Sequence, residues 1–192
     1  MKKEKGIFCI EGMWEKDLRD KKSVYPILDL LQRVEDIPFI YKDAAISGEF
    51  EFYLKKWTQQ RYKEYPILYL AFHGLESCLM LGDGNYELED MSNILAGKCD
   101  GTIIVFGSCN TLSIDKRYIK NFLYKTGALA VCGYGVDVAW TESSAFELML
   151  LSVLQENEFT GRGLASIKRK AYRISKKFPE FQFRMVTRKE LT

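Results

Sequence analysis

The chain has 192 residues, with 28 Lys or Arg against 26 Asp or Glu, so its net charge is only +2. This length suits one domain, and a 47% share of hydrophobic residues supplies a core. No apolar run approaches the roughly 20 residues that span a membrane. The apolar run that starts at Ile7 meets Glu11 too soon for a signal peptide. We therefore expect a single cytoplasmic domain over residues 1–192, without membrane contact.

Strand-like and helix-like patterns alternate along the chain. Apolar runs predict strands over residues 6–10, around 38–41, up to His73, up to Cys109, over 128–132 and over 181–186. Helical spacing predicts helices over residues 24–34, 49–62, 89–96, 115–125, 142–155 and 163–175, the first and fifth capped by Ser23 and Thr141. Turn residues predict a small hairpin over residues 77–88. This order predicts an α/β three-layer sandwich, in which a mostly parallel sheet of about six strands carries helices on both faces.

The five cysteines give no sign of a metal site or of a disulfide framework. Their number is odd, and none stands in Cys-x-x-Cys spacing. With one histidine in the chain, we expect no metal and no cofactor. Cys9 and Cys132 lie inside apolar runs and are expected to be buried, inert thiols. Cys109 differs, because it lies among small polar residues where a strand ends.

The single histidine, His73, follows one apolar run and precedes Gly74, while the next long apolar run ends shortly before Cys109. If these strands are parallel neighbours, both side chains emerge at one edge of the sheet. An imidazole there can deprotonate a thiol and later protonate a leaving amine. The backbone N–H groups of Gly74 and Cys109 are candidate donors to the oxyanion. A lone His or a lone Cys is commonly structural, but their joint placement favours acyl-transfer chemistry.

The ordered set of motifs resembles the caspase-like (clan CD) cysteine peptidases, and within them the CHAT group. The similarity lies in the strand that ends in His73-Gly74, the hairpin that follows, the segment Ser108-Cys109-Asn110-Thr111 and the late segment 163–171, and it covers about residues 6–190. The resemblance implies a caspase-like form of the sandwich. It also implies a dyad in which His73 is the base and Cys109 the nucleophile, an oxyanion hole involving Gly74, and endopeptidase activity in cytoplasmic signalling or prokaryotic defence.

The chain departs from the CHAT pattern at two places. Ser108 stands where these sequences commonly have Ala, and the loop 133–140 does not follow their Trp, Pro and Asp pattern. Within this loop, Asp137 is the acid that we expect in the specificity pocket, where it would favour Arg or Lys before the scissile bond. The alternative is that Asp137 only solvates the loop. Trp140 either walls the pocket or packs in the core.

The expected partner is a protein or peptide substrate. CHAT domains are often fused to repeats or sensors, and none is recognisable here, so we also expect a separate regulatory protein. One rival hypothesis is a catalytically silent scaffold of the same fold. Another is a nucleic-acid-binding protein, because residues 162–192 carry ten Lys or Arg against two Glu. A solvated helix face explains that charge better, since no nucleic-acid motif accompanies it.

Overall fold

The computed structural model describes residues 4–191, so residues 1–3 and 192 of the expected domain lie outside the described part of the chain. A six-stranded sheet has the order β2-β1-β3-β7-β8-β9, and only its last strand runs antiparallel. Strands apolar along their whole length can be buried on both faces, as expected for a parallel sheet. The strands are β1 (Ile7–Glu11), β2 (Phe39–Asp43), β3 (Ile67–Ala71), β7 (Ile103–Gly107), β8 (Ala130–Gly133) and β9 (Arg184–Thr187).

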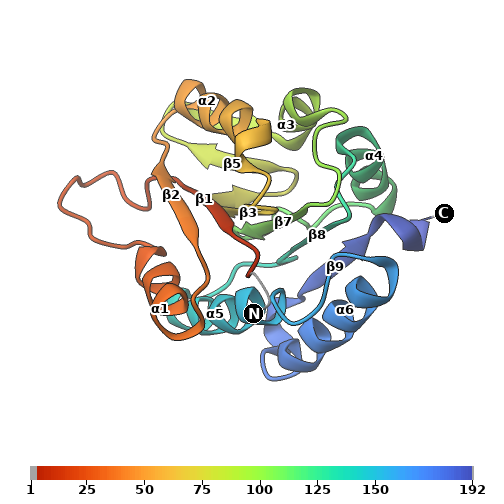
Figure 1. Cartoon of the computed structure of the whole chain (residues 1–192). Coiled ribbons are helices and arrows are strands. Elements are labelled where there is room, and N and C mark those ends of the chain that lie inside the picture. The colour runs from red at the N-terminus through yellow and green to blue at the C-terminus, as the bar shows by residue number, and fades with distance from the viewer. Residues whose placement is uncertain (1–3, 192) are drawn as a thin grey trace.

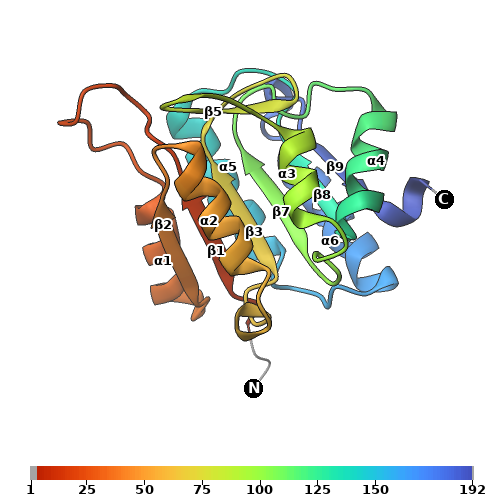
Figure 2. The same cartoon turned by 90° about the horizontal axis from the view of Figure 1, so that it is seen from above.

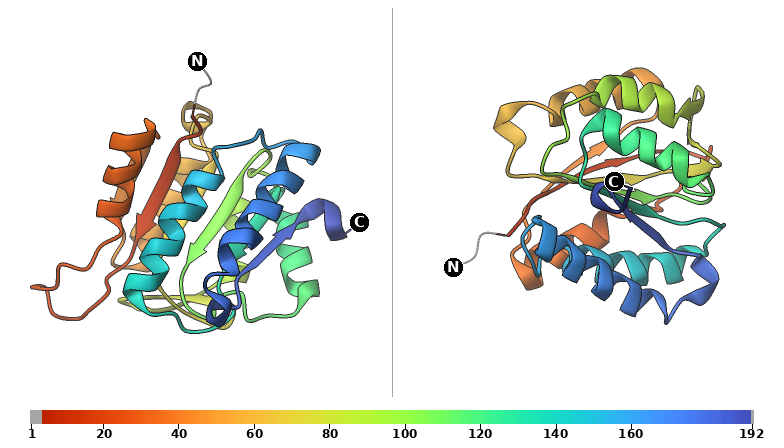
Figure 3. Two further views of the ribbon diagram at one scale, coloured as in Figure 1. Left: turned by 90° about the horizontal axis from the view of Figure 1, so that it is seen from below. Right: turned by 90° about the vertical axis from the view of Figure 1, so that its right-hand side faces the viewer.

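Six α-helices cover the two faces of this sheet, which confirms the predicted three-layer α/β sandwich (Figures 1 and 3). One face carries α1 (Tyr25–Glu35), α5 (Trp140–Val153) and α6 (Gly161–Ser175), and the other carries α2 (Ser47–Trp57), α3 (Leu88–Leu95) and α4 (Lys116–Thr126). Side chains alternate across the sheet because a strand has a period of two residues. Thus Ile7 and Cys9 join the core under α1, α5 and α6, and Phe8 and Ile10 join the other core.

A second, three-stranded antiparallel sheet lies at the carboxyl end of the parallel strands (Figure 2). It consists of β4 (His73–Leu75), β5 (Cys78–Leu81) and β6 (Gly84–Glu87). The strands β5 and β6 form the predicted hairpin, and β4 pairs with β5 as a third strand. The expectation that one strand runs up to His73 was wrong. The strand β3 ends at Ala71, Phe72 donates its N–H to the carbonyl of Gly107 at 3.4 Å, and His73 opens β4.

Several predicted boundaries also need correction. The helix expected over residues 49–62 ends at Trp57, and a separate 3-10 turn, η1 (Gln60–Tyr62), follows it. The helix starts differ from the predicted caps. Ser23 lies one residue before Val24, the N-cap residue of α1, although its Oγ atom accepts the N–H of Tyr25 at 3.0 Å, and α5 begins at Trp140, before Thr141. The last strand is shorter than expected, because residues 179–181 form a 3-10 turn, η2 (Pro179–Phe181), and a final turn, η3 (Arg188–Leu191), follows β9.

The strand order reverses at β1, since the chain pairs β1 with β2 on one side and with β3 on the other. In open parallel sheets, the crevice outside the carboxyl ends of the strands at such a reversal is the usual place for a site. The segments that leave β1 and β3 therefore diverge where a pocket is expected. Those segments carry Trp14 and His73.

Candidate active site

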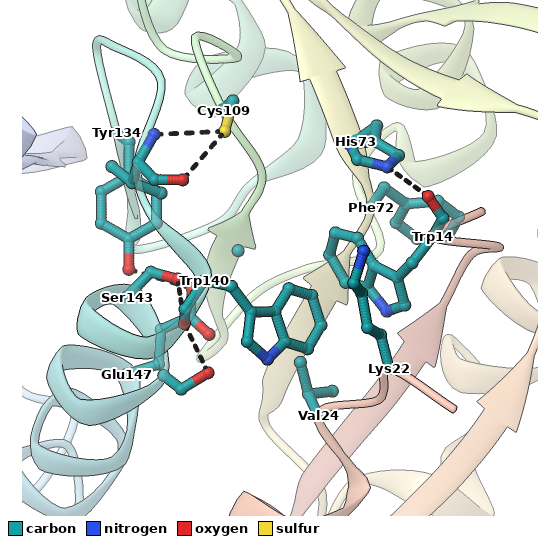
Figure 4. Close-up of a pocket in the computed structure, with 13 residues that line it drawn as sticks. Trp14, Lys22, Val24, Phe72, His73, Cys109, Tyr134, Trp140, Ser143 and Glu147 are labelled. Carbon is teal, nitrogen blue, oxygen red and sulfur yellow. Dashed lines mark hydrogen bonds between the residues drawn. The ribbon is translucent and has the colours of Figure 1, made fainter. Parts of the chain in front are cut away.

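The register of the central strands brings His73 and Cys109 to one edge of the sheet. The strands β3 and β7 are parallel neighbours, and Ala71 is paired with Gly107. His73 lies two residues beyond Ala71, and Cys109 lies two residues beyond Gly107. Neighbouring strands are about 4.8 Å apart. Equal offsets beyond a paired register therefore place both side chains at the rim of one pocket, from opposite sides (Figure 4).

The backbone of Trp14 orients the imidazole of His73. The Nε2 atom of His73 lies 2.6 Å from the carbonyl oxygen of Trp14. A carbonyl oxygen only accepts, so Nε2 carries the proton in this contact and Nδ1 of the neutral ring keeps its lone pair. The indole ring of Trp14 also meets the imidazole edge to face, with ring centroids 5.2 Å apart. His73 is thus held in the tautomer that leaves Nδ1 available as a base.

The sulfur of Cys109 faces the loop between β8 and α5. The N–H of Val138 donates to Sγ at 3.4 Å, and the thiol lies 4.0 Å from the carbonyl of Val138. Within residues 4–191, no hydrogen bond joins Cys109 to His73. Burial raises the pKa of the Cys109 thiol, the N–H of Val138 partly opposes this effect, and the charge of Asp137 adds to it. The half-buried resting sulfur is therefore a thiol that needs a base before it can act as a nucleophile.

Gly74 lies directly against the segment that carries Cys109. A Cβ atom added at Gly74 would come within 2.5 Å of the carbonyl oxygen of Cys109 and 2.3 Å of Oγ1 of Thr111. No side chain fits this space, so the glycine is required by the close approach of β4 to residues 108–111. In the described part of the chain, the backbone N–H of Cys109 donates no hydrogen bond, and it is thus available to an oxyanion.

The pocket beside the two residues has a volume of about 190 Å³ and mostly apolar walls. Trp140 lines this pocket, packs against Trp14 with ring centroids 4.5 Å apart, and also contacts the core under α1, α5 and α6. One carboxyl group lines the pocket, that of Glu147 on α5. The side chains that line it are Trp14, Lys22, Val24, Phe72, His73, Cys109, Tyr134, Val138, Trp140, Ser143, Ser144 and Glu147.

Glu147 is an acid inside the protein. The residue is 5% exposed, and its two carboxyl oxygens accept the hydroxyls of Tyr69 at 2.5 Å and Tyr134 at 2.9 Å. Burial raises the pKa of Glu147 to about 7 although both hydroxyls lower it, and Glu11 raises it further. Near neutral pH the carboxyl group is therefore divided between its charged and neutral forms.

Asp137 has a different place from the one expected. Its exposed side chain is not among the residues that line the pocket. Its Oδ1 atom accepts Nδ2 of Asn110 at 2.6 Å, and the N–H of Asn110 donates to the carbonyl of Val136 at 3.1 Å. Asn110 adopts a left-handed conformation with φ of 55°, which asparagine tolerates better than most residues. Asp137 thus fastens the loop that carries Cys109, and the acid of the pocket is Glu147.

Sequence reasoning missed Trp14 and Glu147. The role of Trp14 rests on a backbone carbonyl 59 residues before its partner, for which no side-chain pattern exists. Glu147 had a signal, since it interrupts the apolar sequence Phe146 to Leu151 of a helix. Within residues 4–191, no group of three His, Cys, Asp or Glu side chains is arranged to hold a metal ion, and no helix is long and apolar enough to cross a membrane.

Fold and site together define a three-layer α/β protein with a histidine and a cysteine at the rim of one pocket. Residues 4–186 match a family described as a family of unknown function (DUF6642). The chain belongs to this family. No curated protein matches the chain.

Proposed function

We propose that the protein is a cysteine endopeptidase in which His73 and Cys109 form a caspase-like dyad. The observation that carries this proposal is the equal offset of the two residues beyond the paired ends of β3 and β7, at the rim of one pocket. The carbonyl of Trp14 adds support, because it occupies Nε2 and leaves Nδ1 as the basic nitrogen.

The chemistry follows from these positions. Nδ1 of His73 takes the thiol proton of Cys109, and the sulfur attacks the peptide carbonyl. The backbone N–H groups of Cys109 and Gly74 are the proposed donors to the oxyanion. The imidazolium then gives its proton to the departing amine, which leaves a thioester on Cys109. Water, deprotonated by His73, hydrolyses the thioester, and the thiol is restored.

The test is turnover of a pooled fluorogenic peptide library in reducing buffer. We expect cleavage by the wild type and none by Cys109→Ala or His73→Ala, with unchanged circular dichroism. Cys132→Ala is the matched control, because Cys132 is a fully buried thiol on the neighbouring strand β8. Equal turnover by wild type and Cys109→Ala would exclude the dyad. A folded wild type that cleaves no peptide would favour the scaffold hypothesis.

We assign to Glu147 the specificity role that the sequence suggested for Asp137. A Lys or Arg side chain in the pocket would find aromatic walls and a carboxyl group that ionises to pair with it. Lys22, at the same pocket, is paired with Glu15 at 2.5 Å. The expected result is a preference for Arg or Lys before the scissile bond that Glu147→Gln weakens at least tenfold. A preference that Glu147→Gln leaves intact would refute this assignment.

The setting that we propose is a cytoplasmic effector in signalling or defence, controlled by a separate protein. For nucleic acid, the distinguishing measurement is salt-dependent binding of DNA or RNA, and its loss when Lys168, Arg169, Lys170 and Arg173 are neutralised. We expect no such binding at low salt.

A further inference from the structure

We propose that Glu11 is a positioning residue for His73, acting through Trp14, so that one buried carboxylate fixes the geometry of the dyad. This inference rests on the proposed function for its catalytic meaning. Its structural part, the control of one imidazole by a carboxylate on another strand, can be tested without any activity.

The carboxylate of Glu11 lies at the carboxyl end of β1 and is 2% exposed. Its Oε1 atom accepts hydrogen bonds from Nε1 of Trp14 at 2.5 Å and from the N–H of Val24 at 2.7 Å. Its Oε2 atom accepts the hydroxyl of Ser23 at 2.6 Å and lies 2.5 Å from the hydroxyl of Tyr41, whose single hydrogen is shared with Oδ1 of Asp43 at 2.6 Å. A carboxylate suits this place because it is an acceptor only, with room for about four donors.

Three of these contacts, to Trp14, Ser23 and Val24, close a loop at its base. Residues 12–24 connect β1 to α1, and their outer part extends from the body of the protein (Figure 2). Leu18, in this outer part, is 90% exposed. Glu11 holds Trp14 near the start of the loop and holds Ser23 and Val24 at its end. Residues 15–22, all of them exposed, lie between these two anchored ends.

The position of Trp14 decides the position of His73. The carbonyl of Trp14 accepts Nε2 of His73, and its indole contacts both His73 and Trp140. His73 is itself exposed, so little other packing holds its ring. A shift of Trp14 would thus release the imidazole. Misplacement of a catalytic group by about 1 Å can cost on the order of a hundredfold in rate.

The test uses the fact that His73 is the only histidine in the chain. In nitrogen-15 spectra of the full chain above neutral pH, its ring gives one unambiguous pair of signals. We expect the wild type to show a protonated Nε2 whose hydrogen exchanges slowly with water. Trp14→Phe keeps the aromatic packing and removes the bond to Glu11, and Glu11→Gln weakens that bond by replacing a group that accepts on both oxygens with an amide that also donates. In both variants the ring hydrogen should exchange at least tenfold faster.

A double-mutant cycle separates positioning from general loosening. If Glu11 acts through Trp14, the Glu11→Gln, Trp14→Phe double variant should affect His73 no more than Trp14→Phe alone. Asp17→Asn is the matched control, because Asp17 lies in the same loop and pairs with Arg19 rather than with Glu11. Unchanged exchange in folded Glu11→Gln and Trp14→Phe would overturn the inference, as would additive effects.

Kinetics then separate the two proposals. With an active wild type, Glu11→Gln should lower kcat by about tenfold or more with the unfolding midpoint nearly unchanged. Faster exchange in the variants of a protein without turnover would uphold the positioning of His73 and favour the scaffold over the peptidase. Turnover with unaltered exchange and kcat in the variants would uphold the peptidase and refute the role of Glu11.

Discussion

Replacement of Glu147 by Gln should make the protein more stable relative to wild type as the pH rises from 4.5 to 7. Two effects compete at this carboxyl group. Burial disfavours the charged form, and the hydroxyls of Tyr69 and Tyr134 favour it. Burial is the larger effect, so the pKa rises from 4.5 in the unfolded chain to about 7 in the fold. Glutamine has the same shape and can still accept one tyrosine hydroxyl while it donates to the other.

The sign follows from the direction of the shift. Below pH 4.5 the carboxyl group is neutral in both states, and folding carries no ionisation cost. As the pH rises towards 7, the unfolded chain releases the proton and the folded chain retains it, so the wild type loses stability. A pKa raised from 4.5 to about 7 corresponds to a loss of about 3 kcal/mol at most. The Gln variant lacks this loss.

The assay is urea unfolding of both proteins at closely spaced pH values between 4 and 8, with the free energy of unfolding extrapolated to water. The free energy of unfolding of the Gln variant, minus that of the wild type, should grow with pH and level off above pH 7. A difference that is flat across this range would show that Glu147 is not perturbed. A difference that falls with pH would show that the two tyrosines outweigh burial.

Three further predictions concern the rim of the pocket. Gly74→Ala should destabilise the fold by about 1–3 kcal/mol and abolish turnover, because the added methyl group overlaps the carbonyl of Cys109; unchanged thermal unfolding would contradict this. Asp137→Ala should lower kcat by removing the bond to Asn110 while leaving the preference for basic peptides, and lost preference would return Asp137 to the pocket. In the folded protein iodoacetamide should modify Cys109 before the buried Cys132, at a rate that still rises from pH 7 to 9 because the thiol pKa is raised; a plateau at neutral pH would indicate a preformed thiolate.

The sequence predicted the layers of the fold better than the ends of its elements. Uniformly apolar strands that alternate with helical spacing leave few arrangements other than a covered parallel sheet. Boundaries depend on contacts that a local pattern does not contain. Phe72, for example, continues the apolar run of β3, but its N–H pairs with Gly107 and the chain turns into a second sheet. Ser23 fits the pattern of a helix cap, but it lies one residue before the N-cap residue Val24, and its hydroxyl donates to Glu11 while it accepts the N–H of Tyr25.

The same distinction holds at the site. His73 and Cys109 could be paired from the sequence because parallel strands fix the edge at which both emerge. Asp137 was expected in the pocket because it is the acid of the adjacent loop, but its partner is Asn110. Glu11 and Glu147 both interrupt apolar runs, and a buried acid needs partners. That signal identifies them as unusual residues, although only the tertiary structure shows that tyrosines, a tryptophan and a loop end are their partners.

The different roles that we propose for the two buried carboxyl groups follow from their different partners. Glu11 accepts two N–H groups besides hydroxyls, and because an N–H can only donate, these contacts require an acceptor oxygen. Glu147 accepts hydroxyls, which can also receive a hydrogen bond, so its neutral form is tolerated. A group that only accepts from these N–H donors suits a residue that holds the loop of Trp14 in place. A carboxyl group that ionises near neutral pH suits a residue that meets a cationic side chain, since the ion pair then forms only when that side chain enters.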